Sequence, residues 1–512
     1  MKNILGPILG FRSCTATKWN CCVLHVFQDL TGAPPALKWK QGSASKTTAG
    51  ARIYTHGNSE VWVYEIPAAV EATESTVTYQ LTDGTGAATF TVPSKGTAPR
   101  MAYCSCNGFS DPKIVRDIAN PIDRWEHLAT QHAAQPFHLL LMGGDQVYAD
   151  QMWVNVPELE EWANKSRYYQ TRSGFTQAME THARQHYFDL YVVNWRRPGP
   201  AEMLASIPTV MMWDDHDITD GWGSHPDNLQ LFNQKLRGGG VLPGLFTVAK
   251  EFFEVFQLRV APGTERPETI TPGGDNLTSL HRFGSIALLV LDLRSERTRN
   301  QIIADESWAH IAAALNALPA EGSVKHLLVM SSIPVVYPNG GVLNGLASLI
   351  PWDPVSDPQD DLIDHWSDSR HHSERERFVR LLFGVAQEKS IRVTLLTGDV
   401  HIAGQGIIES DRNQNVPRNS NVITQLIASG IVHPPSGGPI LLNALNLLAG
   451  SSQEIYRGVE GWLVQFWPNG PYLLPKRNWL SLVPIESNSL RAQWHAESMD
   501  VTLTKDIGPC VN

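Results

Sequence analysis

Acidic residues follow three strongly apolar segments of the sequence, at the positions where each segment ends. The segment 138–142 runs into Asp145, the segment 209–213 runs into the acidic run 214–217, and the segment 392–396 runs into Asp399 and His401. In open α/β sheets, ligands bind beyond the carboxyl ends of the strands. We therefore expect these three acidic ends to converge on one crevice.

Crowded carboxylates need a compensating charge. They repel one another and burial disfavours each charge, so such a group persists around cations or by taking up protons. We favour metal binding. Oxygen and imidazole ligands suit Mn, Fe, Zn or Ca, and a Tyr or Cys ligand shifts the preference towards Fe(III). Two metals about 3.5 to 4 Å apart would clamp the oxygens of a phosphoryl displacement and activate water near neutral pH.

Each motif also has a purely structural interpretation. A single Gly-Asp after a strand often forms a turn or a helix cap. The run 214–217 could begin a solvated helix, because acidic side chains favour helix N-termini, and Cys104 and Cys106 could simply be small buried strand residues. The functional interpretation rests on the order of the motifs, since all of them lie at strand ends within one domain.

The elements that must position these residues are visible from residue 100 onward. Continuous apolar runs alternate with longer helical stretches, which is typical of a sheet covered on both faces. We predict core strands at residues 101–104, 138–142, 209–213, 286–292, 326–330 and 392–396. Amphipathic helices are expected at residues 122–128 and 307–315.

The first hundred residues have a different pattern, with short alternating strands separated by turns. Strands are predicted at residues 22–27, 60–66, 75–81 and 88–92, with a hairpin turn at Asp83-Gly84. Residues 93–99 read as a linker. We therefore predict a small β-sandwich of the immunoglobulin or fibronectin kind in residues 1–97 and an α/β catalytic domain in residues 98–512.

The composition excludes several classes of protein. A net charge of −10 argues against general nucleic-acid binding. No apolar run reaches the length of a membrane-spanning helix, and the N-terminal residues do not form a signal peptide. Six cysteines in 512 residues do not form a disulfide framework. We expect a cytoplasmic protein.

Taken together, the motifs after residue 100 resemble the PhoD-like alkaline phosphatases, within the calcineurin-like metallophosphoesterase superfamily. The matching segments occur in the family's order: Cys-Ser-Cys106-Asn, Gly-Gly-Asp145-Gln-Val-Tyr148, Trp-Asp-Asp215-His216-Asp217, Leu-Asp292-Leu-Arg294, Ser331-Ser-Ile-Pro334 and Gly-Asp399-Val-His401. As a set they are specific, although no single one is. The resemblance implies a four-layer α/β/β/α sandwich behind an N-terminal β-rich domain.

The resemblance also implies a ligand set. Iron(III) would be bound by Cys106, Asp145, Tyr148 and His401. A second metal, calcium in the family's best-understood type, would share Asp145 and use Asp399 and Asp220. The family commonly has Asn where this chain has Asp220, and the added carboxylate leaves zinc, manganese or magnesium as alternatives for the second metal.

The implied reaction is the hydrolysis of phosphate monoesters or diesters through attack by a metal-bound hydroxide. His216, beside the acidic cluster, is our candidate acid or phosphate contact, and capping of the following helix is its structural alternative. Arg294 could grip phosphate oxygens as a bidentate ligand. A structural salt bridge is the alternative for Arg294, because residues 292–299 are rich in charge.

Two apolar, glycine-flanked segments bear on the choice of substrate. Residues 340–350 and 440–448 either pack in the interior or form a lid that admits lipid-like phosphodiesters. A phospholipase D-like phosphodiesterase is therefore one alternative function. The other is a non-catalytic binding protein that its metals merely stabilise, although a structural metal site would saturate its coordination whereas this ligand set leaves room for a substrate.

Overall fold

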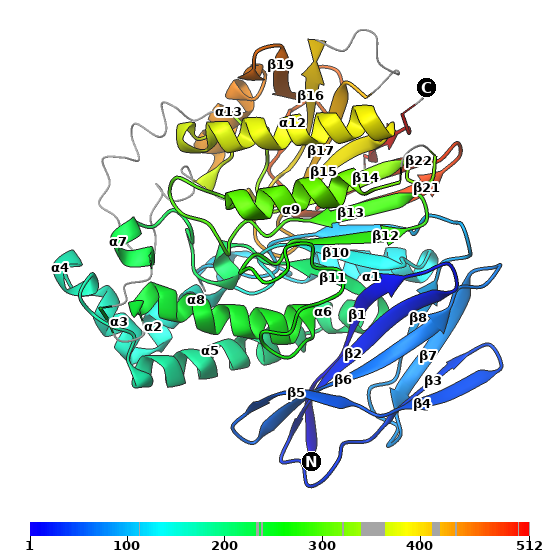
Figure 1. Cartoon of the computed structure of the whole chain (residues 1–512), viewed down its shortest axis with the longest axis vertical. Helices are drawn as coiled ribbons and strands as arrows, with labels where there is room; N and C mark the ends of the chain where they lie inside the picture. The colour runs from blue at the N-terminus through cyan, green and yellow to red at the C-terminus, as the bar shows by residue number, and fades with distance from the viewer. Residues whose placement is uncertain are drawn as a thin grey trace.

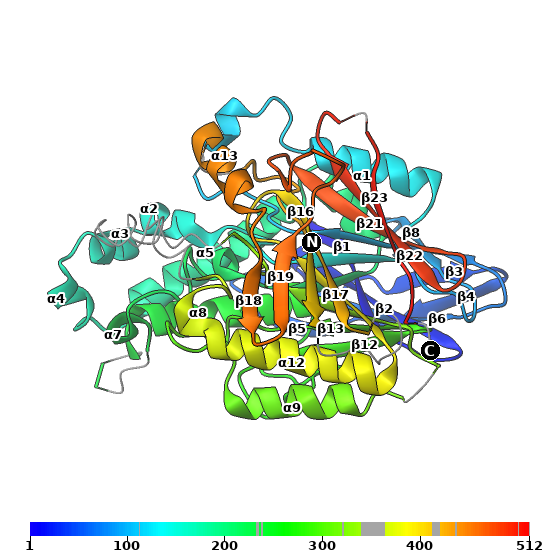
Figure 2. The same cartoon turned by 90° about the horizontal axis from the view of Figure 1, so that it is seen from above.

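The three-dimensional structure of the protein is a computed structural model. It describes residues 1–111, 113–231, 235–236, 239–319, 322–338, 364–411, 420–435, 438–499 and 501–510. Within these residues the strands form three sheets. Helices cover the two larger sheets on their outer faces, as Figures 1 and 2 show.

The first large sheet contains strands from both ends of the chain on either side of β9, β10 and β11. Its strands β9, β10 and β11 are parallel, and β1 continues the sheet beside β11 in the same direction. In spatial order the strands are β23 (Leu503–Ile507), β22 (Ser489–Ala496), β21 (Asn478–Ile485), β9 (Met101–Cys104), β10 (Leu139–Gly143), β11 (Thr209–Met212), β1 (Lys2–Cys14), β2 (Lys18–Gln28), β6 (Ser59–Ala69) and β5 (Ala51–His56).

The second large sheet has a parallel centre made of β13, β14, β15 and β17. In spatial order its strands are β12 (Ser279–Phe283), β13 (Ile286–Val290), β14 (His326–Ser331), β15 (Arg392–Thr397), β17 (Val422–Ala428), β16 (Ala403–Ser410), β19 (Val459–Leu463) and β18 (Gln453–Tyr456), with β20 (Leu473–Leu474) paired to β16. A small third sheet consists of β4 (Ala44–Thr48), β3 (Leu37–Gln41), β7 (Ser75–Leu81) and β8 (Ala88–Val92).

The main helices fall into two groups. The outer face of the first sheet is covered by α1 (Asp123–Ala134), α5 (Gln177–Trp195), α6 (Pro200–Ser206) and α8 (Val241–Phe252). The short helices α2 (Met152–Asn155), α3 (Pro157–Ala163), α4 (Arg167–Gln170) and α7 (Asp227–Gln230) extend from this side (Figure 1). The second sheet carries α9 (Asp305–Asn316), α12 (His372–Lys389) and, near its edge, α13 (Gly438–Leu448).

Alternation along the central strands produces three hydrophobic cores. On β10, Leu140 and Met142 face the helices of the first group, whereas Leu139 and Leu141 face the second sheet. Leu328 on β14 points back into the core between the sheets, while its neighbours on that strand pack against α9 and α12. Successive strand residues point to opposite faces, so two sheets buried on both faces give four layers in the order helix, sheet, sheet, helix.

The α/β class predicted from the sequence is confirmed. All six predicted core strands are present, and the helices expected at residues 122–128 and 307–315 correspond to α1 and α9. The hairpin at Asp83-Gly84 joins the antiparallel strands β7 and β8, and the Asp83 carboxylate accepts a hydrogen bond from the Thr85 amide at 2.9 Å. The segment 340–350 lies outside the described residues, and residues 440–448 belong to α13.

The predicted sandwich in residues 1–97 requires a correction. This segment is rich in strands as expected, but β1, β2, β5 and β6 are part of the first large sheet and not of a separate domain. Leu9 and Trp39 pack in the same core as Leu141 and Leu328. The sequence showed local alternation only, and the parallel pairing of β1 with β11, about two hundred residues away, leaves no local signal. The sheets do not divide at residue 97.

Among the described residues, the helices are too short or too polar to cross a membrane.

Burial of His281 generates a prediction about acid stability. His281 lies on β12 in the interior, 4% exposed, and burial, aided by Arg266, lowers its pKa to about 3. The unfolded chain, with the ordinary histidine pKa of about 6.5, binds the proton first as the pH falls. The stability that neutral His281 provides is therefore complete above about pH 6.5 and is lost progressively below it.

Between pH 7 and pH 5, the free energy of unfolding of the wild type should fall by about 2 kcal/mol more than that of His281→Phe, because phenylalanine cannot titrate. Urea unfolding at both pH values measures this difference. Exposed His372, replaced by Gln, is the control for the loss of one histidine. An identical pH dependence in the wild type and His281→Phe would contradict the prediction.

Candidate metal centre

The candidate ligands lie in loops that leave the carboxyl ends of the parallel strands. Cys106 follows β9, Asp145 follows β10, and the run 214–217 follows β11 in the first sheet. Asp399 and His401 follow β15 in the second sheet. Because the two sheets face each other, these loops meet at one end of the core between them.

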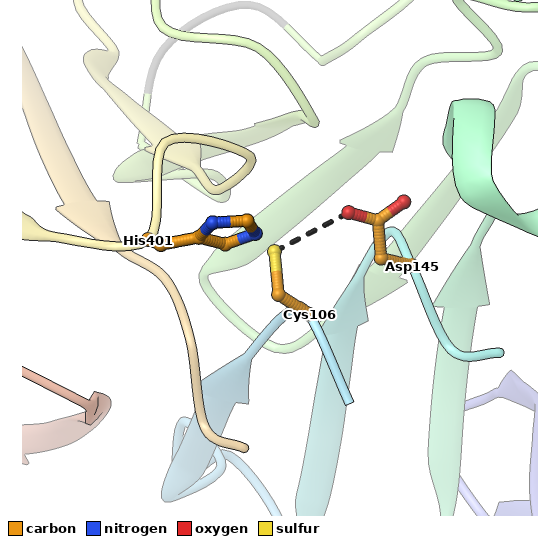
Figure 3. Close-up of side chains that lie close together, drawn as sticks. All are labelled: Cys106, Asp145 and His401. Carbon is orange, nitrogen blue, oxygen red and sulfur yellow. Dashed lines mark hydrogen bonds between the residues drawn. The ribbon is translucent and has the colours of Figure 1, made fainter. Parts of the chain in front are cut away.

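One group of side chains combines sulfur, oxygen and nitrogen atoms. Ligand atoms of Cys106, Asp145 and His401 lie within 4.8 Å of one another. The Cys106 thiol donates to Asp145 Oδ2 at 3.4 Å, and the His401 ring approaches the sulfur from the side opposite Asp145, as Figure 3 shows. The Tyr148 hydroxyl lies 3.3 Å from His401 Nε2. The structure thus brings together the four residues expected to bind iron.

Two further groups extend from the same carboxylate. Asp145, Asp214, Asp215 and Asp399 form a group of carboxylate oxygens within 4.8 Å of one another, and Asp145, Asp215 and His216 form a third group. Asp145 belongs to all three. A carboxylate in this position could contribute oxygens to more than one cation.

The backbone of this centre is held in an uncommon conformation. Cys106, Asp145, Asp399 and His401 all have a positive φ, between 53° and 67°. For residues other than glycine the left-handed conformation costs roughly 1–2 kcal/mol each, and such strain persists where surrounding structure fixes it, often at functional sites.

Hydrogen bonds between the loops fix these conformations. The Cys106 amide donates to the Gly144 carbonyl at 3.1 Å, and the Asn107 amide donates to the Asp145 carbonyl at 2.8 Å. The His401 amide donates to the Ser429 hydroxyl at 3.0 Å, and that hydroxyl is 3.1 Å from Cys106 Sγ. Ser429 therefore links the two sheets at the centre.

Gly144 allows two of the loops to approach each other. It has a φ of 107°, and a Cβ atom there would lie 2.8 Å from the Asp214 Cβ. Any larger residue would separate Asp145 from the acidic run that follows β11.

The carboxylates of the centre are removed from water at considerable cost. Asp145 and Asp214 are each 1% exposed. Burial raises the pKa of Asp145 well above its usual range, and the neighbouring aspartates raise it further although His216 opposes them. Burial also raises the pKa of Asp214 to about 6, in spite of Arg294. Asp145 therefore stays charged at neutral pH only if additional positive charge is present.

The described residues leave part of this charge uncompensated. Asp145 Oδ1 and Asp214 Oδ2 are buried and have no hydrogen-bond partner among them. Buried carboxylate oxygens without a partner are costly. Both residues belong to the carboxylate-rich group, so the residues present fit a bound cation.

The remaining donors point to the same conclusion. Burial, together with Asp145, raises the pKa of Cys106 well above its usual range, and burial does the same for Tyr148. Burial and the neighbouring His433 lower the pKa of His401. His401 is therefore neutral and has a lone pair to donate, whereas Cys106 and Tyr148 lose their protons only if a cation stabilises the anions.

His216 is held beside the centre by a residue that sequence reasoning missed. Its Nδ1 lies 2.7 Å from Asp150 Oδ2, and its ring centroid is 4.3 Å from that of Tyr148. Burial lowers the pKa of His216, but Asp150, Asp215 and Asp220 outweigh this and raise it. Asp150 follows the recognised Gly-Asp-Gln-Val-Tyr motif by two residues, which was its only signal in the sequence.

The contacts of Arg294 favour the structural alternative over a grip on phosphate. Arg294 is 0% exposed. Its Nε donates to Asp214, and its two terminal nitrogens donate to the Trp222 carbonyl, to Asp215 and to both oxygens of Asp364. These contacts occupy all five N–H groups of a guanidinium. The side chain therefore positions the carboxylates and has no donor left for a substrate.

Two other aspartates lie near the centre. No role was predicted for Asp217, whereas Asp220 was predicted to bind the second metal. Asp217 accepts from the amides of Asp214, Gln146 and Val147, so it ties the loop after β10 to the loop after β11. Asp220 Oδ1 lies 3.8 Å from His216 Nε2, and its amide donates to Asp150. Its role as a ligand of the second metal stays a prediction, whereas Asp214 and Asp215 lie beside Asp145 and Asp399.

Comparisons with known proteins identify the family and the fold of the chain. A family model described as PhoD related phosphatase matches residues 70–351 and 341–461. An uncharacterized protein of Saccharomyces cerevisiae is 25% identical over 84% of this chain and 72% of its own length. The solved structure of PhoD superposes with a TM-score of 0.56 at 12% identity, covering 97% of this chain and 88% of that one. At this identity the structural match shows the fold alone.

The contacts of Arg294 generate a prediction about stability. Removing one partner of a buried ion pair leaves a buried charge uncompensated, at a cost of roughly 3–5 kcal/mol. We expect Arg294→Met to lose about that much free energy of unfolding, measured by chemical denaturation. Arg491→Met, which breaks an exposed pair with Asp506, is the control and should leave the free energy of unfolding nearly unchanged. Unchanged stability with a raised KM would instead mean that Arg294 binds the substrate.

Proposed function

The chain belongs to the PhoD-related phosphatase family, and on that premise we propose that it is a metal-dependent phosphoesterase that hydrolyses phosphate esters at the centre around Asp145. One observation carries the proposal. Six side chains from loops of both sheets, three of them carboxylates, gather around Asp145, and two buried carboxylate oxygens have no partner among the described residues. Cations that neutralise this group would also attract a phosphate.

The chemistry of the donors favours two different metals. Cys106, Asp145, Tyr148 and His401 offer sulfur, phenolate and imidazole ligands, which suit iron(III). The carboxylate-rich group of Asp214, Asp215, Asp399 and the shared Asp145 offers oxygen alone, which suits calcium, with magnesium or manganese as alternatives and zinc at a mixed site. Asp220 would complete the second site if its side chain turned inward.

When bound, such cations polarise the phosphate and lower the pKa of water. The chain's own residues would position the reacting groups. Arg294, Asp217 and Ser332 keep the carboxylates in place, since Ser332 Oγ donates to Asp214 at 2.9 Å and Arg294 donates to the same residue. Asp150 occupies Nδ1 of His216, so Nε2 is the ring atom from which a proton would pass to the leaving oxygen.

The substrate is proposed at the level of a phosphate ester. Hydrolysis of monoesters, of diesters, or of both is consistent with an open metal centre. A panel of mono- and diesters, a diester lipid among them, would separate a phosphomonoesterase from a phospholipase D-like enzyme. Bound metal without turnover of any of these compounds would support the non-catalytic alternative.

We expect Asp145→Asn and Asp399→Asn to lower kcat/KM below a tenth of the wild-type value, a loss of more than about 1.4 kcal/mol of transition-state stabilisation. An amide cannot neutralise a cation, so each change weakens metal binding while keeping the shape of the side chain. Exposed Asp305→Asn is the matched control and should leave the rate unchanged. A folded Asp145→Asn variant that keeps its activity and its metal content would disprove the ligand assignment.

A second prediction concerns colour and tests the iron assignment. A phenolate or thiolate bound to iron(III) transfers charge to the metal in visible light, so the iron-replete protein should be coloured. Tyr148→Phe keeps the ring and removes the oxygen, and it should shift or weaken the absorption band. Cys106→Ser should do the same, while Cys104→Ser, two residues earlier at the end of β9 and outside the three groups, serves as the control.

Visible absorption spectra and metal analysis of the purified variants make this measurement. An active protein that is free of iron and colourless would disprove the tyrosinate and thiolate assignments. It would leave the carboxylate-based centre untouched.

A further inference from the structure

A large cleft adjoins the candidate metal centre. Its volume is about 600 Å³, within the range of roughly 300–1,000 Å³ that encloses small ligands in proteins. Its walls come from the loop after β9, the start of the segment after Tyr148, helix α5 and the loop before α6.

The walls of this cleft are largely apolar. Phe109, Val115, Ile122, Leu190, Val193 and Val432 line it, together with three prolines. Val115 and Val193 are 37% and 41% exposed, respectively. Single exposed apolar residues are normal on protein surfaces, but a set that converges on one concavity marks a binding groove.

Most polar groups in the cleft already have partners. Asn107 accepts from Trp125 Nε1 at 2.9 Å, and Gln151 donates to the Ser110 carbonyl at 2.7 Å. His186 Nε2 lies 3.2 Å from the Ala149 carbonyl, and Asp189 accepts from Gln185 at 2.8 Å. These contacts hold the walls in place. What the cleft offers a ligand is therefore chiefly apolar surface.

Tyr148 and Asn107 connect the cleft to the centre. Both line the cleft. On the side of the centre, the Tyr148 hydroxyl lies 3.3 Å from His401 Nε2, and Asn107 directly follows Cys106. Gly108 admits the Tyr148 ring, because a Cβ atom there would lie 2.3 Å from Tyr148 Cδ2. The same ring thus contacts the candidate ligands and forms part of the cleft wall.

We infer that this cleft binds the apolar alcohol portion of the phosphate ester, so that the protein prefers esters of alkyl or aryl alcohols. The inference rests on the proposed function, because the phosphate must sit at the metal centre for the alcohol to reach the cleft. The occupant is a substrate group because Tyr148 borders both spaces, and it is apolar because the free surface of the walls is apolar.

Two homologous series of esters test the preference. The protein as purified, with its metals, is assayed on ethyl, butyl and octyl phosphate and on the corresponding methyl alkyl diesters. The leaving group has nearly the same chemistry along each series, so chain length changes mainly the apolar area that is buried. We expect kcat/KM to rise by up to about fourfold per methylene until the chain fills the cleft.

Substitutions in the walls of the cleft test whether the cleft causes the preference for longer alkyl chains. In the double variant V115Q/V193Q, the ratio of kcat/KM for octyl phosphate to that for ethyl phosphate should fall at least tenfold. The matched control is V154Q in α2, since Val154 is 58% exposed but does not line the cleft. This control should keep the wild-type ratio. An equal fall in both variants would overturn the inference.

Binding of alkylphosphonates, which cannot be hydrolysed at the carbon–phosphorus bond, separates the inference from the proposed function. Calorimetry should show affinity rising from ethylphosphonate to octylphosphonate in the wild type and a weaker rise in V115Q/V193Q. Affinity that does not depend on chain length overturns the cleft assignment even if esters are hydrolysed. Failure to hydrolyse any ester, with chain-length-dependent binding retained, overturns the proposed function and supports the cleft.

Discussion

Burial of several carboxylates at one end of the core between two sheets is the constraint on which the rest of this structure depends. Asp145, Asp214, Asp215 and Asp217 are almost inaccessible to water, and Asp399 lies beside them. Charges of like sign removed from water cannot be stable by themselves. The protein's own groups compensate part of this negative charge, and bound cations would compensate the rest.

The internal part of the answer is a network of positioning residues. Arg294 neutralises Asp214 and holds Asp364, so that burial of Asp364 is outweighed by Arg294 and Arg297 and its pKa falls to about 2. Asp217 instead receives backbone amides, which let it tie two loops together. Asp145 receives no such compensation at Oδ1. Asp214 also keeps one oxygen without a partner among the described residues, so Asp145 and Asp214 offer oxygens to a cation, whereas Asp217 and Asp364 hold the scaffold.

Architecture and chemistry are coupled through the loops at the strand ends. Two sheets that face each other place the carboxyl ends of their parallel central strands side by side, which is why residues about three hundred positions apart meet. Cys106, Asp145, Asp399 and His401 adopt left-handed backbone conformations there, and contacts across the seam, such as those of Ser429, hold them. Tyr148 extends the centre outward, since its ring contacts both the candidate ligands and the apolar cleft.

The sequence by itself determined the features that are written in short stretches of chain. Apolar runs identified the core strands, and acidic residues at their ends identified Asp145, Asp399 and His401 as neighbours, because parallel strands end at the same edge of a sheet. The motif order also indicated the family. The signals for the strands and for the site residues each lie within a dozen residues of the feature that they predict.

Only the tertiary structure decided the features that depend on distant pairing. Strand β1 joins β11 across the predicted domain boundary, and Arg294 is surrounded by three aspartates, so neither its burial nor its lack of free donors could be foreseen. The contact of His216 with Asp150 and the apolar cleft likewise arise where separate segments meet. Local patterns fix which residues form strands and which carry chemistry, whereas packing between segments fixes which charges are compensated and which surfaces stay open.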